Sequence, residues 1–163
     1  MVGYPGAGKT TLSKLLAKET GAFHLWADAE RHNMFDEPTH SHEESLKLYD
    51  ELNIRAKELL QQGNSVVFDT NFNFKSDRDK LTLLANDNDA ESIIVWVDTP
   101  LEIARNNAVH QPVLRNGYMY GMSGDQFDAI VSKLEPPTES ENYIKIDRSQ
   151  FDPQHLPAIL KNT

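Results

Sequence analysis

The chain has 163 residues, about the size of one domain, and its 16 Lys and Arg against 25 Asp and Glu give a net charge of -9. This charge argues against broad affinity for nucleic acid, although a local basic groove is compatible with it. No cysteine is present, which excludes disulfides and thiolate catalysis. No apolar run reaches the roughly 18 residues of a membrane span and no signal peptide opens the chain, so we expect a cytoplasmic protein without an obligate protein partner.

The first motif is a glycine-rich loop, Gly3-Tyr4-Pro5-Gly6-Ala7-Gly8-Lys9-Thr10, which matches G-x-x-x-x-G-K-[ST]. We call it the P-loop, because its glycines let backbone N–H groups surround an anion and a following helix adds the positive end of its dipole. Lys9 is expected to reach the β- and γ-phosphates and Thr10 to hold Mg²⁺. The alternative is a simple turn before a helix. The predicted nucleotide contacts are Gly3, Pro5, Gly6, Ala7, Gly8, Lys9, Thr10 and Thr11.

Strand and helix signals then alternate along the chain. An apolar stripe of Leu12, Leu15 and Leu16 predicts a helix that Gly21 ends. Residues 32–44 hold a proline, three histidines and several acids, and we expect a mobile connection in which solvated histidines are far more common than metal ligands. The remaining predicted elements are strands at 22–26, 65–68, 92–97 and 143–147, helices at 46–60 and from Ser76, Pro100, Ser123 and Leu156, and a loop at 109–124.

This alternation predicts an α/β fold with a parallel sheet and right-handed crossovers. In such sheets the ligands bind at the carboxyl ends of the strands. The side chains that fall at or just beyond the predicted strand ends are Lys9, Asp28, Asp69, Asp98 and Asp147. Several acids at one rim favour a functional site there, although Asp also suits strand-ending turns in general.

The chain resembles the P-loop kinases related to polynucleotide 5′-kinase, chloramphenicol phosphotransferase and zeta-type toxins, grouped as AAA-type kinases. Besides the P-loop, the resemblance rests on Asp28-x-x-Arg31, on VVFDTN at 66–71 with Arg78 beyond it, and on P-x-x-x-E within 135–141. It implies a single domain over residues 1–163: a three-layer sandwich around a parallel five-stranded sheet, with a lid at about 105–124. It also implies ATP and Mg²⁺ as cofactors and a hydroxyl-bearing acceptor.

The motifs also fit phosphoryl transfer, which needs positioning and charge neutralisation more than covalent assistance. Asp28 is expected to accept the proton of an attacking hydroxyl, and Arg31 to hold Asp28 or an acceptor phosphate in place. The alternative is a helix N-terminal acid with its i+3 salt bridge. Asp69 resembles a Walker B carboxylate acting on Mg²⁺ or its waters, or else simply ends a strand.

In these relatives the lid carries two arginines that neutralise charge on the transferred group and contact the nucleotide. Arg105-Asn106 resembles the start of that lid, but the position expected for the second arginine is Val109. Arg115 is the other arginine in the lid stretch, and a catalytic role and a solvated one are both open for it.

Two functions remain open at this level. The first is an ATP-dependent kinase acting on a hydroxyl, either at a nucleic-acid 5′-end, which the motifs favour, or on a small molecule, which the net charge favours. The second is an ATP-sensing or slowly hydrolysing P-loop protein whose degenerate lid supports no transfer.

Only Met1 and Val2 precede the P-loop, whereas a strand usually needs about five residues. In the related kinases the strand that feeds the P-loop lies in the middle of the sheet, so the resemblance places these two residues at the centre. We therefore expect about three to five more apolar residues upstream in the natural protein, or a tag or neighbouring segment that fills the gap.

Overall fold

The computed structural model describes the backbone of residues 1–111, 113–115, 118–149 and 151–156. It describes their side chains except those at 113–115, 118–120 and 155. Four strands form two parallel pairs, β1 (Phe23–Trp26) with β2 (Val66–Asp69) and β3 (Ile94–Asp98) with β6 (Tyr143–Asp147). Trp26 pairs with Asp69 and Asp98 with Asp147, so the predicted parallel arrangement with acids at the carboxyl ends is confirmed.

Met1 and Val2 lie between the two strand pairs. Val2 bridges Trp96 in parallel: its N–H donates to the Val95 carbonyl (2.9 Å) and its carbonyl accepts from the Val97 N–H (2.8 Å). On the other side the Met1 ammonium donates to the Phe68 carbonyl of β2 (3.4 Å). The chain start is therefore central, as expected, but the predicted five-stranded sheet is not confirmed, because two residues form one bridge rather than a strand.

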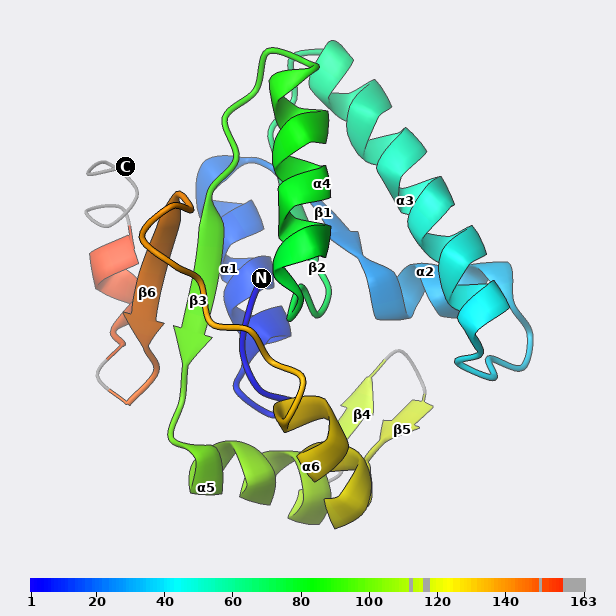
Figure 1. Ribbon diagram of the computed structural model, residues 1–163, viewed down its shortest axis with the longest axis vertical. Coiled ribbons are helices and arrows are strands. Elements are labelled where there is room, and N and C mark those ends of the chain that lie inside the picture. Colours follow the sequence, from blue (N-terminus) through cyan, green and yellow to red (C-terminus); the bar gives the residue numbers. More distant parts are fainter. Residues whose placement is uncertain (112, 116–117, 150, 157–163) are drawn as a thin grey trace.

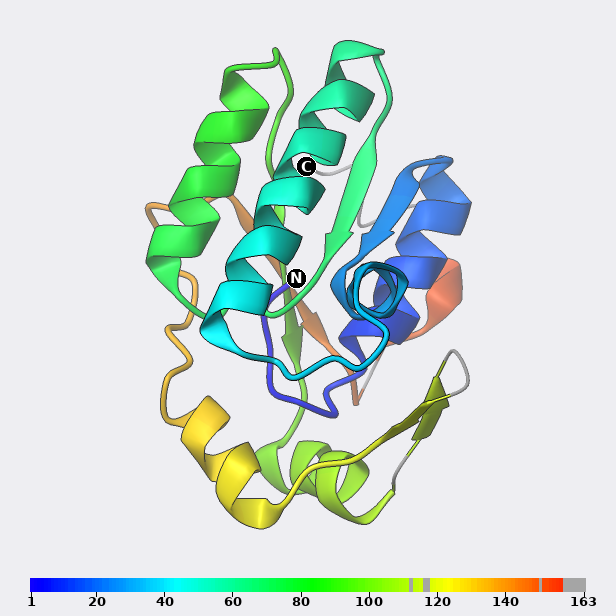
Figure 2. The ribbon, with the colours of Figure 1, turned by 90° about the vertical axis from the view of Figure 1, so that its right-hand side faces the viewer.

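Helices cover both faces of these strands, as Figures 1 and 2 show. α1 (Lys9–Thr20) packs on one face, where an apolar core includes Leu12, Leu16 and Val97. α3 (His42–Gln61) and α4 (Lys75–Asn86) cover the other face, where a second core includes Leu25 and Leu48. The layers follow from the apolar period of α1 and α3, each of which buries one stripe of leucines against the strands.

The predicted mobile connection at 32–44 is partly wrong. α2 (Ala27–Met34) follows β1 directly, and α3 begins at His42, so the connection shrinks to residues 35–41. Ser41 is the N-cap of α3 and accepts a hydrogen bond from the Glu44 N–H (3.3 Å). The end of α2 and the start of α3 lack an apolar period, because their residues are mostly polar. The sequence signal for the start of α3 was an N-cap residue followed by acids in the first turn.

Beyond the carboxyl ends of the strands lie α5 (Leu101–Arg105), a π-helical turn (Asn106–His110), a hairpin of β4 (Val113–Arg115) and β5 (Tyr118–Tyr120), and α6 (Gly124–Val131). The hairpin corrects the predicted loop at 109–124. Asn-Gly between two short apolar runs is the commonest hairpin signal, and the sequence carries it at 116–117. Ser123 caps α6 as predicted. Pro153–His155 form a 3₁₀ turn, while Ile159 and Leu160 of the predicted closing helix lie outside the described residues.

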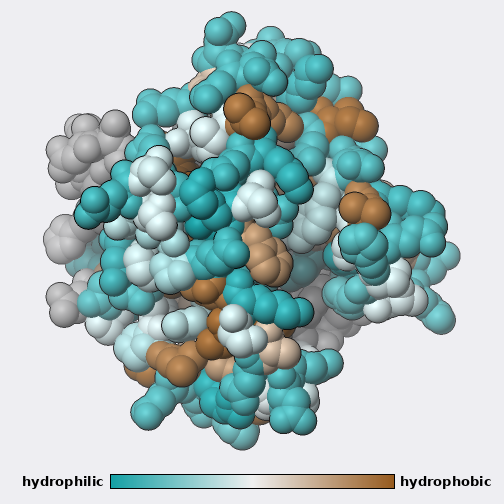
Figure 3. Space-filling model, viewed as in Figure 1, coloured by the Kyte–Doolittle hydropathy of each residue, from teal (hydrophilic) through white to brown (hydrophobic). Residues whose placement is uncertain are grey.

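The face in Figure 3 is mainly hydrophilic, with apolar side chains in small scattered groups. Among the described residues, no helix combines the length and apolar character needed to cross a membrane.

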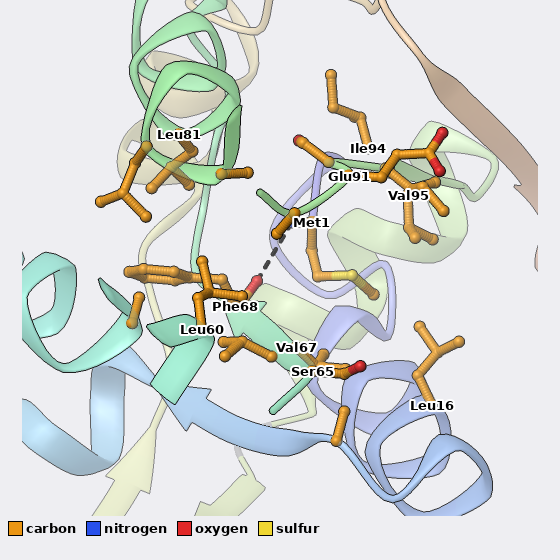
Figure 4. A pocket seen from close by; sticks show the side chains of 18 of the residues that line it. Met1, Leu16, Leu60, Ser65, Val67, Phe68, Leu81, Glu91, Ile94 and Val95 are labelled. Carbon is orange, nitrogen blue, oxygen red and sulfur yellow. Dashed lines mark hydrogen bonds between the residues drawn. The ribbon is translucent and has the colours of Figure 1, made fainter. Parts of the chain in front are cut away.

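A cavity of about 580 Å³ opens between the two strand pairs, beyond the amino end of Met1. Figure 4 shows Met1 beside Phe68, with Leu60, Leu81 and Ile94 among the surrounding side chains. In a parallel ladder the N–H and C=O of one residue point to the same side of the strand. The Val95 carbonyl accepts from the Val2 N–H, so the Val95 N–H lies on the same side of β3, where the cavity opens. Burial lowers the pKa of the Met1 ammonium to about 5, although the Asp69 carboxylate acts in the opposite direction.

Four β-branched residues added before Met1 are expected to raise the melting temperature. The added strand would continue the register of Val2 along β3, pair the exposed backbone groups and bury apolar surface, at about 25 cal/mol per Å². It also replaces the buried ammonium with an amide. Because the folded pKa of Met1 is about 5 against 8.0 unfolded, stability rises with pH between these values, and the gain on extension is larger at pH 6 than at pH 9.

A Gly-Ser extension of equal length is the matched control, since it removes the ammonium but leaves the cavity unfilled. It should raise the melting temperature at pH 6 and have little effect at pH 9. If the β-branched extension is no more stable than the 163-residue chain at either pH, the cavity is not a strand position.

Candidate active site

The P-loop joins Val2, in the middle of the strands, to the amino end of α1. Lys9 folds back over the loop, and its Nζ donates to the carbonyl oxygens of Gly3 (2.9 Å) and Tyr4 (2.8 Å). Lys9 also takes part in a further interaction. The ammonium is therefore held where the loop surrounds it, at the positive end of α1.

Two glycines of the P-loop are required by close approach and by backbone conformation. Gly6 (φ 76°) would place a Cβ onto the Ala104 carbonyl oxygen, and Gly8 (φ 92°) would place one 3.3 Å from Nε of Arg148. Both φ values lie in the left-handed region that side chains disfavour. α5 and the π-helical turn after it thus pack directly on one part of the P-loop, and the segment after β6 packs on another.

Two residues that hold the P-loop, and a third that lies beside it, were not predicted. The buried Thr99 donates through Oγ1 to the Ala7 carbonyl (3.0 Å), and Asn107 donates through Nδ2 to the Gly6 carbonyl (3.1 Å). Arg148 lies beside Gly8 with its guanidinium over Phe151, 5.1 Å from the ring centroid. Thr99 and Arg148 each follow a strand end, and that position was the available signal for both.

A cleft of about 670 Å³ joins the P-loop to the acidic residues at the strand ends. It brings together five predicted site residues: Lys9, Thr10, Asp28, Arg31 and Asp69. Pro5, Gly6 and Gly8 also line it, whereas Gly3 and Ala7 are buried and do not line it. Thr11 is exposed on α1 and Arg105 lies apart, and neither lines the cleft.

Asp28 occupies the first turn of α2 and is half-buried in the cleft. Its backbone carbonyl accepts from Nδ1 of His32 (2.8 Å). Among the described residues, no hydrogen bond or ion pair engages its carboxylate. The carboxylate is thus available to a bound molecule.

Arg31 pairs with Glu44 of α3 rather than with Asp28. Both side chains are 7% exposed, and Nη2 of Arg31 also donates to Oγ of Ser45 (3.3 Å). Glu44 accepts in addition from the Thr39 N–H (2.7 Å) and hydroxyl (2.8 Å). Burial alone would raise the pKa of Glu44, but the hydrogen bonds from Arg31, Thr39 and His40 lower it to about 2. A contact between Arg31 and Asp28, one of the alternatives left open by the sequence, is therefore not formed.

The same glutamate shapes the connection between α2 and α3. Its Oε1 accepts from the N–H of His40 (3.2 Å), which adopts the left-handed conformation (φ 55°) that few non-glycine residues adopt. His40 lines the cleft and is exposed, as the sequence predicted for a solvated loop histidine. Strained backbone of this kind is concentrated at functional sites.

Asp69 ends β2 and is buried at 3% exposure. Its Oδ2 lies 3.0 Å from Nε2 of His24 on the neighbouring strand, and the His24 ring stacks on Trp26. Among the described residues, no three His, Cys, Asp or Glu side chains gather into a metal site. An oxygen pair such as Thr10 and Asp69 still fits Mg²⁺, because this ion usually binds through one or two protein oxygens, substrate phosphates and water.

Of the two predicted lid arginines, the structure describes the side chain of Arg105 but not that of Arg115. Arg105 forms an ion pair with Asp128 of α6 and lies over the Phe127 ring, 5.4 Å from its centroid. It therefore faces α6 rather than the cleft. Arg115 ends β4, and its side chain lies outside the described part of the chain.

Arg78 of α4 organises the loop that follows Asp69. It donates to both carboxylate oxygens of Glu141 (2.6 and 3.1 Å) and to the carbonyls of Phe72 and Glu135 (3.0 Å each). Both charged side chains are almost fully buried, at 2% and 4% exposure. The P-x-x-x-E segment thus acts as a clamp on the loop that carries Thr70 and Asn71.

Arg78→Ala is expected to destabilise the fold by about 3 to 5 kcal/mol, because it leaves the Glu141 carboxylate buried without its partner. Urea unfolding followed by circular dichroism measures this loss. Lys80→Ala, which removes an exposed pair with Asp77 on the same helix, should cost about 0 to 1 kcal/mol. Equal effects of the two substitutions would show that the clamp does not stabilise the fold.

Solved structures share this fold. Chaetomium thermophilum Kti12 in complex with ADP-AlF3 superimposes with a TM-score of 0.74 at 18% identity, covering 99% of this chain and 95% of that one. A sugar kinase from Janibacter sp. HTCC2649 gives 0.66 at 22% identity, covering 99% and 88%. The Mycobacterium tuberculosis APS kinase CysC in complex with AMPPNP and APS gives 0.66 at 16% identity, covering 98% and 94%.

The fold is thus that of the P-loop kinases, and the resemblance seen in the sequence is confirmed. The chain belongs to the AAA domain family, whose model matches residues 1–137. No curated protein sequence matches it.

Proposed function

We propose that the protein transfers the γ-phosphate of ATP to a hydroxyl group of an acceptor. The observation that carries this proposal is the shared cleft: the P-loop lysine and the Asp28 carboxylate, which no described residue engages, line the same space. A phosphate-binding group and an available base are the two parts that phosphoryl transfer to a hydroxyl requires.

ATP is proposed to bind with its phosphates in the P-loop. Lys9 then exchanges the carbonyls of Gly3 and Tyr4 for phosphate oxygens, which carry full negative charge and form stronger hydrogen bonds. The neighbours that were solved with ADP-AlF3 and with AMPPNP support a nucleotide in this cleft. Arg148 and Asn107, which contact the P-loop, would keep its shape as the phosphates enter.

Thr10 and Asp69 are proposed to hold Mg²⁺, directly or through its waters. The ion, when bound, neutralises charge on the β- and γ-phosphates. His24 would fix the orientation of the Asp69 carboxylate through its contact at 3.0 Å.

Asp28 is proposed to orient the acceptor hydroxyl and to take its proton as the oxygen attacks the γ-phosphorus. The bond from the γ-phosphorus to the β,γ-bridging oxygen breaks, and ADP leaves. Arg31 lies within the same wall of the cleft and stays a predicted acceptor-side group, held by Glu44.

Arg105 and Arg115 stay predicted lid cations. For Arg105 to reach the transferred group it must leave Asp128, a partly exposed pair that holds it weakly. The arrangement of Arg105 and the valine at position 109 favour the second candidate function, a P-loop protein that binds or slowly hydrolyses ATP without transfer.

A thermal-shift screen of hydroxyl compounds, run with a non-hydrolysable ATP analogue, tests the proposal. A kinase should gain stability from the analogue and a further increment from its acceptor, by mass action. Stabilisation by the analogue with no response to any acceptor class supports the sensing function, and no response to the analogue contradicts both.

A further inference from the structure

The charges along the cleft restrict what the acceptor can be. Among the described residues that line it, Lys9, Arg31 and His40 are the basic side chains and Asp28 and Asp69 are the acidic ones. Lys9 is part of the P-loop, and Arg31 is neutralised by a buried glutamate directly behind it. As far as the described side chains show, an anionic group on the acceptor side would therefore face Asp28 without a compensating arginine charge.

The other polar side chains that the structure describes on this side of the cleft are neutral. The Tyr49 hydroxyl lies 2.9 Å from the Thr70 hydroxyl, and both line the cleft beside Asn71. Each of these groups keeps hydrogen-bonding capacity after the pairing, and together with the His40 ring they can donate to and accept from several hydroxyls. The net charge of -9 adds a repulsive field for any polyanion.

We propose that the acceptor is a small uncharged polyol, such as a sugar or cyclitol, and that Glu44 is the positioning residue that sets this preference. Glu44 does so by neutralising Arg31 and by holding His40 in the cleft wall. The proposal rests on the proposed kinase function and adds the class of acceptor to it. The reaction forms an O–P bond on one polyol hydroxyl, whose proton passes to Asp28, and releases ADP.

The first test is acceptor-dependent ADP formation with ATP and Mg²⁺. The panel pairs neutral sugars and cyclitols with their phosphorylated and carboxylated counterparts, and adds an oligonucleotide with a free 5′-hydroxyl. Turnover with members of the neutral set, and at least about tenfold lower kcat/KM for their anionic counterparts, is expected. Preferred use of the oligonucleotide or of an anionic acceptor overturns the inference and leaves the kinase function standing.

The second test removes the neutralising charge. Glu44→Gln keeps an oxygen acceptor for Thr39 and His40 but frees the Arg31 charge, so the KM of an anionic acceptor should fall by roughly tenfold relative to its neutral counterpart. The double variant Arg31→Gln and Glu44→Gln should return the ratio to that of the wild type. Glu30→Gln, which breaks the more exposed pair with Arg55 outside the cleft, should leave the ratio unchanged.

Circular dichroism and binding of the ATP analogue check that each variant folds. If Glu44→Gln does not fold, the double variant, which leaves no uncompensated charge, carries the test: it must retain the wild-type preference for neutral acceptors. An unchanged ratio in folded Glu44→Gln contradicts the role of Glu44. Binding of the analogue without turnover on any panel member contradicts the kinase function, and the inference falls with it.

Discussion

Lys9→Ala is expected to abolish nucleotide-dependent turnover while the fold survives. The substitution removes the one P-loop ammonium, and losing a single donor that stabilises developing charge typically costs about 10² to 10³-fold in rate. The folded chain loses two hydrogen bonds to the Gly3 and Tyr4 carbonyls, each worth roughly 1 to 3 kcal/mol, against a typical stability of about 5 to 15 kcal/mol. ATP titration and circular dichroism measure the two effects separately.

Lys18→Ala is the matched control, because Lys18 is an exposed lysine in the last turn of the same helix. It should leave ATP affinity and turnover unchanged. Wild-type affinity and turnover in folded Lys9→Ala would contradict the assignment of the P-loop.

Asp28→Asn should impair phosphoryl transfer far more than ATP binding. The amide keeps the shape of the side chain but cannot accept the acceptor proton, and general-base catalysis is typically worth about 10² to 10⁴-fold. Since no described residue pairs with this carboxylate, the substitution breaks no ion pair and should hardly change the melting temperature.

The measurement is kcat with a saturating acceptor beside ATP affinity, with Asp36→Asn as control. Asp36 lies just beyond α2, is exposed and does not line the cleft. Similar losses of transfer and of ATP affinity in Asp28→Asn would show that Asp28 supports the structure of the site and does not accept the proton of the acceptor.

Features that depend on neighbouring residues could be predicted from the sequence. The P-loop, the end of α1 at Gly21 and the cap of α6 at Ser123 each follow from a short pattern, because the physical cause is local. The hairpin at β4 and β5 also had a local signal in Asn116-Gly117, and the sequence interpretation missed it by giving weight to loop length instead.

Features that depend on tertiary contacts could not be predicted. The partner of Arg31 is set by how α3 packs on α2. The three-residue spacing of the motif favoured a pair with Asp28, whereas in the fold Arg31 pairs with Glu44. For Arg148 the sequence signal was its position after a strand end, but its contact with Gly8 also depends on the pairing of β6 with β3. The five-stranded sheet is not confirmed for another reason: Met1 and Val2 occupy the central position but form one bridge rather than a strand.

The central claim is that phosphate moves from ATP to a hydroxyl acceptor, and its most direct test follows the label of ATP carrying ³²P at the γ-position. The proposed function predicts that the label appears in a phosphate ester of the acceptor, that this product requires the acceptor, and that Asp28→Asn suppresses it. Label released only as inorganic phosphate, at a rate independent of every acceptor, would contradict the claim.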